Sequence, residues 1–194
     1  MYLIVGLGNP SPEYDGTRHN LGRVAVSAWL AAQENFRPAQ APDTGAELWR
    51  GTANGQEVIV APSLGGYMNE SGRPMLAILQ FFKIPVPNLI LVHDELALPL
   101  SQLRLDHNIS SAGHNGVQSV INAVGTQDFV RLRLGVESRA DHTVPSEDFV
   151  LQKFSTEEET TVTTMVTRVT ETLDAIFTHG LDRAMTEYNR IVSG

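Results

Sequence analysis

The chain has 194 residues, of which 42% are hydrophobic, and it carries a formal net charge of −8 and no cysteine. A chain of this size forms one domain with an adequate core, and without cysteine it has no disulfide, thiolate nucleophile or thiolate-ligated zinc. The acidic balance argues against broad, non-specific nucleic-acid binding, although it leaves room for a local basic patch. No segment is apolar for long enough to cross a bilayer and no basic leader precedes the first apolar run, so we expect a cytoplasmic protein without a membrane partner.

The first predicted elements are a buried strand and a helix with polar residues between them. Tyr2–Gly6 is a short apolar run that ends in glycine, which is typical of a buried strand. Apolar residues then recur at helical spacing over residues 21–29. Ligands of open α/β sheets bind at the carboxyl ends of strands, so the intervening segment is the first candidate for chemistry. It contains an amide, a phenol, a guanidinium and an imidazole: Asn9, Tyr14, Arg18 and His19.

Glycines at the end of this strand also suggest a dinucleotide-binding turn. Gly6-x-Gly8 matches the start of that fingerprint. However, the third glycine position is Ser11, Pro10 interrupts the run, and no acidic residue closes a second strand at the required distance. Nucleotide binding is therefore the weaker interpretation.

The rest of the chain alternates predicted strands and helices, which is typical of an α/β domain with a parallel or mixed sheet. A hairpin is predicted at residues 47–60 around Asn54-Gly55, and residues 89–92 form the strongest candidate for a central buried strand. Further half-exposed strands are predicted at 103–105 and 130–136. Helices are predicted at about 71–82, around 117–121, from a capping box at Ser155 and Glu158 to Gly180, and at 181–191. Residues 33–45 and 138–146 have the composition of surface loops.

Three further polar clusters allow both a structural and a functional interpretation. Asn69 is suited to capping the helix that follows it. Asp94 either caps a strand or orients an imidazole, as the acid of a catalytic triad does. His114 lies between glycines where a helix begins, which suits a tight turn or an anionic or carbonyl ligand at exposed N–H groups. Asp94 and Glu95 are adjacent in the predicted strand and would point to opposite faces, which disfavours a mechanism with paired carboxylates.

Five motifs, in order and at matching spacings, resemble those of the bacterial peptidyl-tRNA hydrolase family. They are Val5-Gly6-Leu7-Gly8-Asn9-Pro10, Thr17-Arg18-His19-Asn20, Tyr67-Met68-Asn69-x-Ser71-Gly72, His93-Asp94-Glu95-Leu96-x-Leu98-Pro99 and Gly113-His114-Asn115-Gly116. Arg131-Leu132-Arg133-x-Gly135 and the helix after Gly180 also resemble that family, so the likeness covers nearly the whole chain. It implies one α/β domain over residues 1–194, with a twisted mixed β-sheet flanked by helices. It also implies a metal-independent, monomeric hydrolase without a cofactor, which cleaves the ester of peptidyl-tRNA and so recycles tRNA from chains that drop off ribosomes.

The resemblance further implies roles for individual residues. His19 would be the general base that activates water, Asp94 would orient it, and Asn9 would complete the catalytic set. The substrate-binding residues would be Tyr14, Met68, Asn69, His114, Asn115 and Arg133, the last of them meeting tRNA phosphate. The chemistry is consistent, because histidine suits proton abstraction near neutral pH and amides can stabilise developing charge. No serine or cysteine elbow is visible, so we expect direct attack by water rather than an acyl-enzyme.

Several positions depart from the family pattern, and Asp106 is the most consequential. The family has a lysine at this position, which together with Arg133 is thought to clamp a phosphate, whereas a carboxylate repels phosphate. The neighbouring His107 is a weak substitute for that lysine. The family's glycine run is replaced by Asn108-Ile109-Ser110. Other departures are Ser11, Gly66, Ala97 and Gly135-Val136-Glu137.

These departures define an alternative to an active peptidyl-tRNA hydrolase. The chain could be a divergent paralogue with a weakened tRNA grip, acting on another ester or serving as a non-catalytic RNA-binding or protein-binding module. Restoration distinguishes the two: if Asp106→Lys sharply raises activity and the salt dependence of tRNA binding, the native chain is not tuned for tRNA.

Overall fold

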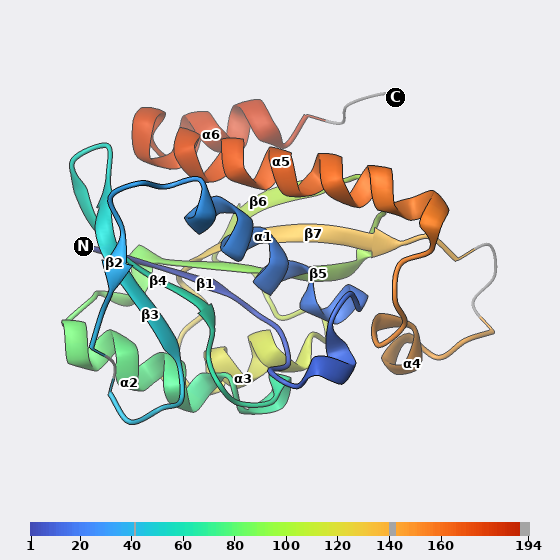
Figure 1. The fold of residues 1–194 in the computed structure, drawn as a ribbon, viewed down its shortest axis with the longest axis horizontal. Coiled ribbons are helices and arrows are strands. Elements are labelled where there is room, and N and C mark those ends of the chain that lie inside the picture. The colour runs from blue at the N-terminus through green and yellow to red at the C-terminus, as the bar shows by residue number, and fades with distance from the viewer. Residues whose placement is uncertain (41, 140–142, 191–194) are drawn as a thin grey trace.

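A seven-stranded mixed sheet forms the middle of the protein (Figure 1). The computed structural model describes residues 1–40, 42–139 and 143–190. The strand order is β2-β3-β4-β1-β5-β7-β6. β1 pairs in parallel with β4 and β5, and β5 pairs in parallel with β7, whereas the β2–β3, β3–β4 and β6–β7 pairs are antiparallel. The strands are β1 (Tyr2–Gly6), β2 (Arg37–Pro38), β3 (Glu47–Ala53), β4 (Gln56–Ser63), β5 (Leu89–Pro99), β6 (Leu103–His107) and β7 (Val130–Glu137).

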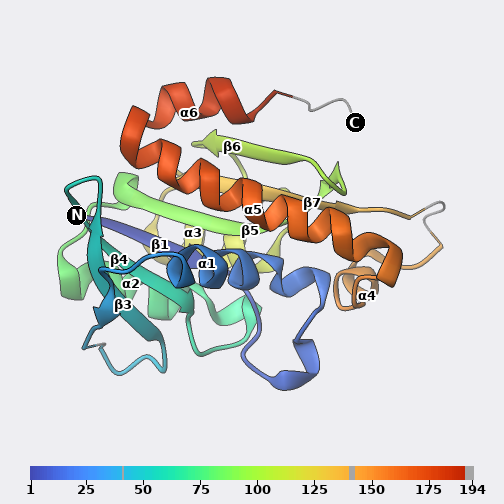
Figure 2. The same ribbon diagram turned by 45° about the horizontal axis from the view of Figure 1, so that its top comes forward.

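Helices cover both faces of this sheet and enclose two hydrophobic clusters. α1 (Leu21–Ala31), α5 (Thr156–His179) and α6 (Leu181–Tyr188) pack on one face, where Figure 2 shows α5 running across β5 and β7. α2 (Gly72–Phe82) and α3 (Asn115–Val124) pack on the other. The remaining helices are short: η1 (Pro12–Tyr14), η2 (Arg18–Asn20), η3 (Met68–Glu70), η4 (Val86–Asn88) and α4 (Ser146–Val150). None of the helices within the described residues is long and apolar enough to cross a membrane.

Close packing of α1 on β5 places the segment before α1 at the carboxyl end of the sheet. A Cβ on Gly22 would lie 2.3 Å from the carbonyl oxygen of Val92, so only glycine permits this approach. Leu7 N–H donates to the same Val92 oxygen at 2.9 Å, and Arg23 N–H donates to Leu7 O at 3.0 Å. The polar segment between β1 and α1 is thereby fixed beside the end of β5.

Most of the predicted elements are confirmed. The hairpin turns at Asn54 and Gly55, which have φ values of 45° and 77° as a tight hairpin requires. The capping box of Ser155 and Glu158 opens α5, and Gly180 closes it. The predicted loop over 33–45 contains the two-residue β2, and the predicted loop over 138–146 ends where α4 begins, with 140–142 outside the described residues. The last predicted helix ends at Tyr188, and Ile191 also lies outside the described residues.

The prediction that residues 130–136 form a half-exposed strand is wrong. β7 lies between β5 and β6 and is buried along most of its length, with Arg131 only 1% exposed. Its arginines bond to groups inside the protein, although Nε and Nη2 of Arg131 are buried without a hydrogen-bond partner among the described residues. Arg131 Nη1 donates to Ser110 O at 2.7 Å, and Arg133 binds two carboxylates described below. The alternation of arginines with apolar residues is therefore misleading in the sequence: it looks like that of a strand with one face in solvent, but the partners of these arginines lie inside the protein.

Candidate active site at the ends of β1 and β5

A cleft of about 680 Å³ opens at the carboxyl ends of β1 and β5. Its volume lies within the range of small-molecule binding sites. The cleft gathers all but one of the predicted site residues: Asn9, Tyr14, His19, Met68, Asn69, Asp94, His114 and Asn115. Arg133 is not among its lining residues. Tyr67, Val150 and Leu151 add an apolar rim, to which α4 contributes although the sequence analysis did not predict that helix.

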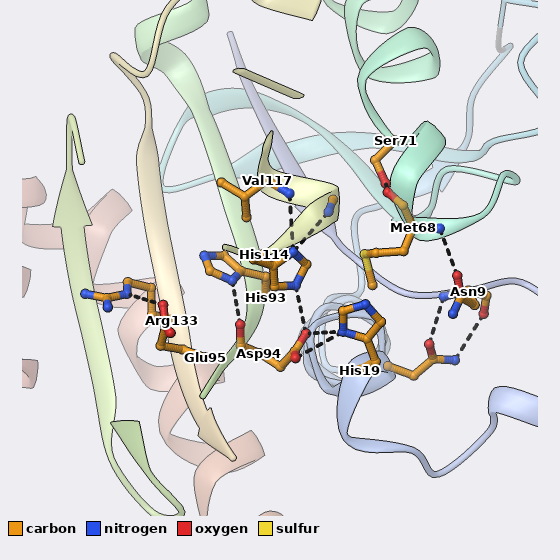
Figure 3. Close-up of polar contacts among 12 residues, drawn as sticks. Asn9, His19, Met68, Ser71, His93, Asp94, Glu95, His114, Val117 and Arg133 are labelled. Carbon is orange, nitrogen blue, oxygen red and sulfur yellow. Dashed lines mark hydrogen bonds and ion pairs between the residues drawn. The ribbon is translucent and has the colours of Figure 1, made fainter. Parts of the chain in front are cut away.

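Asp94 accepts hydrogen bonds from two imidazoles (Figure 3). His19 Nδ1 lies 3.1 Å from both carboxylate oxygens, and His114 Nε2 lies 2.9 Å from Oδ1. Burial by itself would raise the pKa of Asp94, but the charges and hydrogen bonds of His114 and His19 hold that pKa well below its usual range. The carboxylate therefore stays ionised, and the idea that Asp94 merely caps a strand is wrong because it lies within β5.

The ring of His114 has a tautomer that its neighbours dictate. Its Nδ1 accepts hydrogen bonds from the backbone N–H groups of Gly116 at 3.1 Å and Val117 at 3.3 Å, so its proton is on Nε2, facing Asp94. Of the two interpretations of this segment, a tight turn or a ligand at exposed N–H groups, the second does not hold for Gly116 and Val117, because their N–H groups are bonded to this ring. His19 in turn donates from Nδ1, which leaves its Nε2 as a proton acceptor.

His19, Asp94 and His114 also lie close enough to suggest a metal site, since their ligand atoms are all within 4.8 Å of one another. A histidine that binds a metal through one nitrogen normally donates a hydrogen bond from the other. A metal on Nε2 of His114 would require Nδ1 to donate a hydrogen bond, but this Nδ1 accepts hydrogen bonds from two backbone N–H groups. The three residues suit a hydrogen-bonded network better than a metal centre.

Asn9 has its side-chain amide oriented by the protein. Its Oδ1 accepts from Met68 N–H at 2.8 Å, which leaves Nδ2 as a donor at the cleft. Asn20 fixes the backbone of Asn9 by bonding both its N–H, at 2.8 Å, and its carbonyl, at 3.0 Å. Asn20 was part of a motif, but nothing in the sequence pattern indicated this role.

Asn69 and Asn115 have exposed side chains that make no hydrogen bond within the described residues. The alternative that Asn69 caps α2 is wrong, because Asn69 lies inside η3 and the N-cap residue of α2 is Ser71. Both amides are open to a ligand in the cleft.

Arg18 holds the His19 segment from behind. It is 4% exposed and donates to both carboxylate oxygens of Glu158 at 2.7 Å and to Lys153 O at 2.6 Å. The rings of Phe149 and Phe154 lie 4.3 and 4.8 Å from its guanidinium carbon. Arg18 thereby ties η2 to the α4–α5 connection. The sequence pattern predicted that Glu158 belongs to a capping box, but it did not predict that Arg18 is buried against it.

His93, like Asn20 and Arg18, has a role that the sequence pattern did not indicate. It is buried, its Nδ1 donates to Asp94 O at 2.7 Å, and its ring packs edge-on against that of His114, with ring centroids 4.8 Å apart. Burial lowers the pKa of His93 well below its ordinary value, so this imidazole is neutral. His93 therefore supports the ring of His114 without adding charge.

Arg133 lies behind one wall of the cleft and is engaged by carboxylates. Its Nε is 3.0 Å from Glu95 Oε2 and its Nη1 is 2.8 Å from Asp106 Oδ2. Burial alone would lower the pKa of Arg133, but Asp106 and Glu95 together raise it. Glu95 thus points away from the partners of Asp94, as expected for adjacent residues of a strand.

Comparison with known proteins identifies related chains over nearly the full length. The family model described as peptidyl-tRNA hydrolase matches residues 3–193. The peptidyl-tRNA hydrolase of Bdellovibrio bacteriovorus is 36% identical over 97% of this chain and 100% of that protein, and the one from Levilactobacillus brevis is 40% identical over 90% and 91%. The crystal structure of the peptidyl-tRNA hydrolase from Acinetobacter baumannii superposes with a TM-score of 0.87 at 27% identity, covering 97% of this chain and 94% of that one.

Proposed function

The chain belongs to the peptidyl-tRNA hydrolase family, and from this premise we propose how its residues hydrolyse peptidyl-tRNA. His19 is the general base. Its Nδ1 is committed to Asp94, so Nε2 takes a proton from a water molecule as that water attacks the ester carbonyl. The ionised Asp94 holds the ring in this tautomer and stabilises the imidazolium that forms.

Amide donors stabilise the oxyanion that develops on the carbonyl oxygen. Asn9 Nδ2 is held ready because Met68 N–H fixes the other end of the amide. Donors that are oriented before the reaction lose no energy in reorganising as charge develops. Asn69 and Asn115 offer further amides to the peptide carbonyls, while Tyr14 and Met68 line the cleft around the acyl group.

Collapse of the tetrahedral intermediate completes the reaction. The bond from the acyl carbon to the 3′ oxygen of tRNA breaks, and the proton held on His19 Nε2 passes to that oxygen. The products are tRNA with its 3′ hydroxyl restored and the free peptide acid, which releases its proton to solvent to give the carboxylate. His114 acts as a positioning residue, because both of its ring nitrogens are bonded within the protein.

The observation that carries this proposal is the single carboxylate of Asp94 shared by two imidazoles of fixed tautomer. Every residue to which the mechanism assigns a role belongs to one chain, and we propose that a monomer is active. The substrate arises during translation, so the enzyme acts in the cytoplasm. The non-catalytic alternative is not favoured, because the base, the orienting carboxylate and the amides are all present.

Cleavage of purified peptidyl-tRNA by the wild type, His19→Ala and Asp94→Asn tests the mechanism. We expect turnover by the wild type, and losses of about 10²–10⁴-fold in kcat for both variants, the contribution typical of a positioned acid or base. Circular dichroism and a melting curve check that each variant is folded. A folded His19→Ala variant that keeps wild-type kcat would rule out His19 as the base.

A further inference from the structure

A second cleft, of about 1030 Å³, lies between α2 and α3. It shares Asn69 and Asn115 with the catalytic cleft, so the two meet at these residues. We name it the α2/α3 groove. Beyond the shared pair, its walls include Arg73, Ala77 and Gln80 from α2 and Gln118, Ser119 and Asn122 from α3.

The base of the groove is fixed by a close helix crossing. A Cβ on Gly72 would lie 2.1 Å from Ser119 O, so the helices touch through their backbones at this point. Gly72 N–H donates to Ser119 Oγ at 3.0 Å, which satisfies a free donor at the start of α2. The groove is therefore bounded by two helices that are rigidly joined next to the active site.

The chemistry of the groove favours a peptide. Its charged residues are Asp43, Glu70 and Arg73, two carboxylates and one guanidinium, which give a net charge of −1. A polynucleotide binds through several basic side chains that neutralise its phosphates, and the described lining has only Arg73, beside two carboxylates. Side-chain amides instead donate to and accept from an uncharged peptide backbone. The amides of the groove are those of Asn69, Gln80, Asn115, Gln118 and Asn122. Gln118 is already bonded to Ser111 and to Asn122 Oδ1, so the amides offered to a peptide are those of Asn69, Gln80 and Asn115 and the Nδ2 of Asn122.

The substrate must extend in two directions from its ester, because the acyl carbon joins a peptide to tRNA. Resting on the proposed function, we infer that the α2/α3 groove binds the upstream residues of the peptide after they pass Asn69 and Asn115. Its volume is at the upper end of small-molecule sites, which is enough for a short extended segment. The groove makes the enzyme favour longer peptides over a single aminoacyl residue.

Ala77→Trp and Asn122→Trp test this inference, since each places an indole on one wall of the groove without altering a residue of the catalytic cleft. Thr163→Trp on the exposed face of α5 is the matched control. The substrates are tRNAs that carry one N-acetylated residue or peptides of two, four and six residues, and kcat/KM is measured for each. Melting curves identify any variant that does not fold.

We expect kcat/KM of the wild type and of Thr163→Trp to rise with peptide length by about tenfold, the equivalent of one or two hydrogen bonds to the bound chain. Ala77→Trp and Asn122→Trp should lose that rise and keep wild-type cleavage of the single-residue substrate. A length profile that is flat in the wild type, or unchanged in both folded variants, would overturn the inference.

An equal loss for all substrates in the groove variants would also overturn it and would indicate that the groove takes the tRNA arm. Failure of the wild type to cleave any substrate would instead refute the proposed function itself. Cleavage of the single-residue substrate thus separates the two failures.

Discussion

Arg133 Nη1 lies 2.8 Å from Asp106 Oδ2, so the arginine expected to meet a tRNA phosphate is bonded to a carboxylate of its own chain. Asp106 replaces a lysine of the family pattern, and the structure shows that its carboxylate binds Arg133. The side chains are 17% and 26% exposed, which leaves the pair accessible at the surface. Glu95 and Asp106 already bind Nε and Nη1 of Arg133, so a phosphate that binds these nitrogens has to displace a carboxylate.

Asp106→Asn should therefore strengthen tRNA binding. Removing the carboxylate leaves Arg133 paired with Glu95 alone, and the guanidinium becomes available to one phosphate. We expect the slope of log K against log salt to steepen by about 0.7–0.9, the contribution of one neutralised phosphate. Asp128→Asn is the control, because Asp128 is paired with His107 and not with Arg133. Equal effects of both substitutions would show a general charge effect.

Substitution of His114 should separate the effect of its bond to Asp94 from that of its bonds to the first N–H groups of α3. Asparagine is a good N-cap residue, so His114→Asn keeps a cap for α3 but loses the bond to Asp94, whereas His114→Ala loses both. We expect kcat to fall by at least about tenfold in both variants with little change in KM, since an orienting hydrogen bond is lost. Only the alanine variant should also lose about 1 kcal/mol of unfolding free energy. A large rise in KM alone would indicate that His114 binds substrate directly.

His93 should make the folded state sensitive to acid. Burial lowers its pKa in the folded protein below the ordinary value of 6.5, so only the unfolded chain binds the proton near that pH. The contribution of neutral His93 to the free energy of unfolding is complete above pH 6.5. It is lost as the pH falls, at about 1.4 kcal/mol per pH unit. When the free energy of unfolding is measured in urea between pH 7.5 and 5, it should fall less steeply with pH in His93→Asn than in the wild type. His179→Asn, which removes an exposed imidazole, should leave it unchanged.

The buried Arg18–Glu158 pair should contribute to both stability and catalysis. Arg18→Met leaves the carboxylate of Glu158 without its cation and releases η2, which carries His19, from the α4–α5 connection. We expect a loss of about 3 kcal/mol in unfolding free energy and a lower kcat. Arg50→Met is the matched control, because the Arg50–Glu57 pair is about half exposed and should contribute less than about 1 kcal/mol. Denaturant unfolding and turnover of folded protein measure both effects.

The fold could be predicted because its elements have strong local signals. β1, the Asn54-Gly55 hairpin and the capping box of α5 each depend on residues close in the sequence. The burial of β7 could not be predicted in this way, because it depends on Glu95, Asp106 and Ser110, which reach its arginines from other segments. The five-residue α4 has too few residues for a periodic signal.

The candidate site shows the same division. The types of side chain at the strand ends were evident from the motifs, and eight of the nine predicted residues line one cleft. The direction of each hydrogen bond was not evident from the motifs. For example, Nδ1 of His114 is identified as an acceptor only by the N–H groups of Gly116 and Val117 that donate to it. The exception is Arg133. In the sequence, Asp106 is recognisable only as the replacement of a lysine, and not as the hydrogen-bond partner of Arg133.

The central place of β1 has a consequence for the synthesis of the protein. β1 leaves the ribosome before its partners β4 and β5, so the edge of β1 that pairs with β5 stays unpaired until Leu89–Pro99 has emerged. At ordinary rates of translation this interval is on the order of five to twenty seconds. His114 contacts Asp94, so under the proposed mechanism a fragment released before that residue is inactive. An enzyme that hydrolyses peptidyl-tRNA thus depends on the completion of its own synthesis.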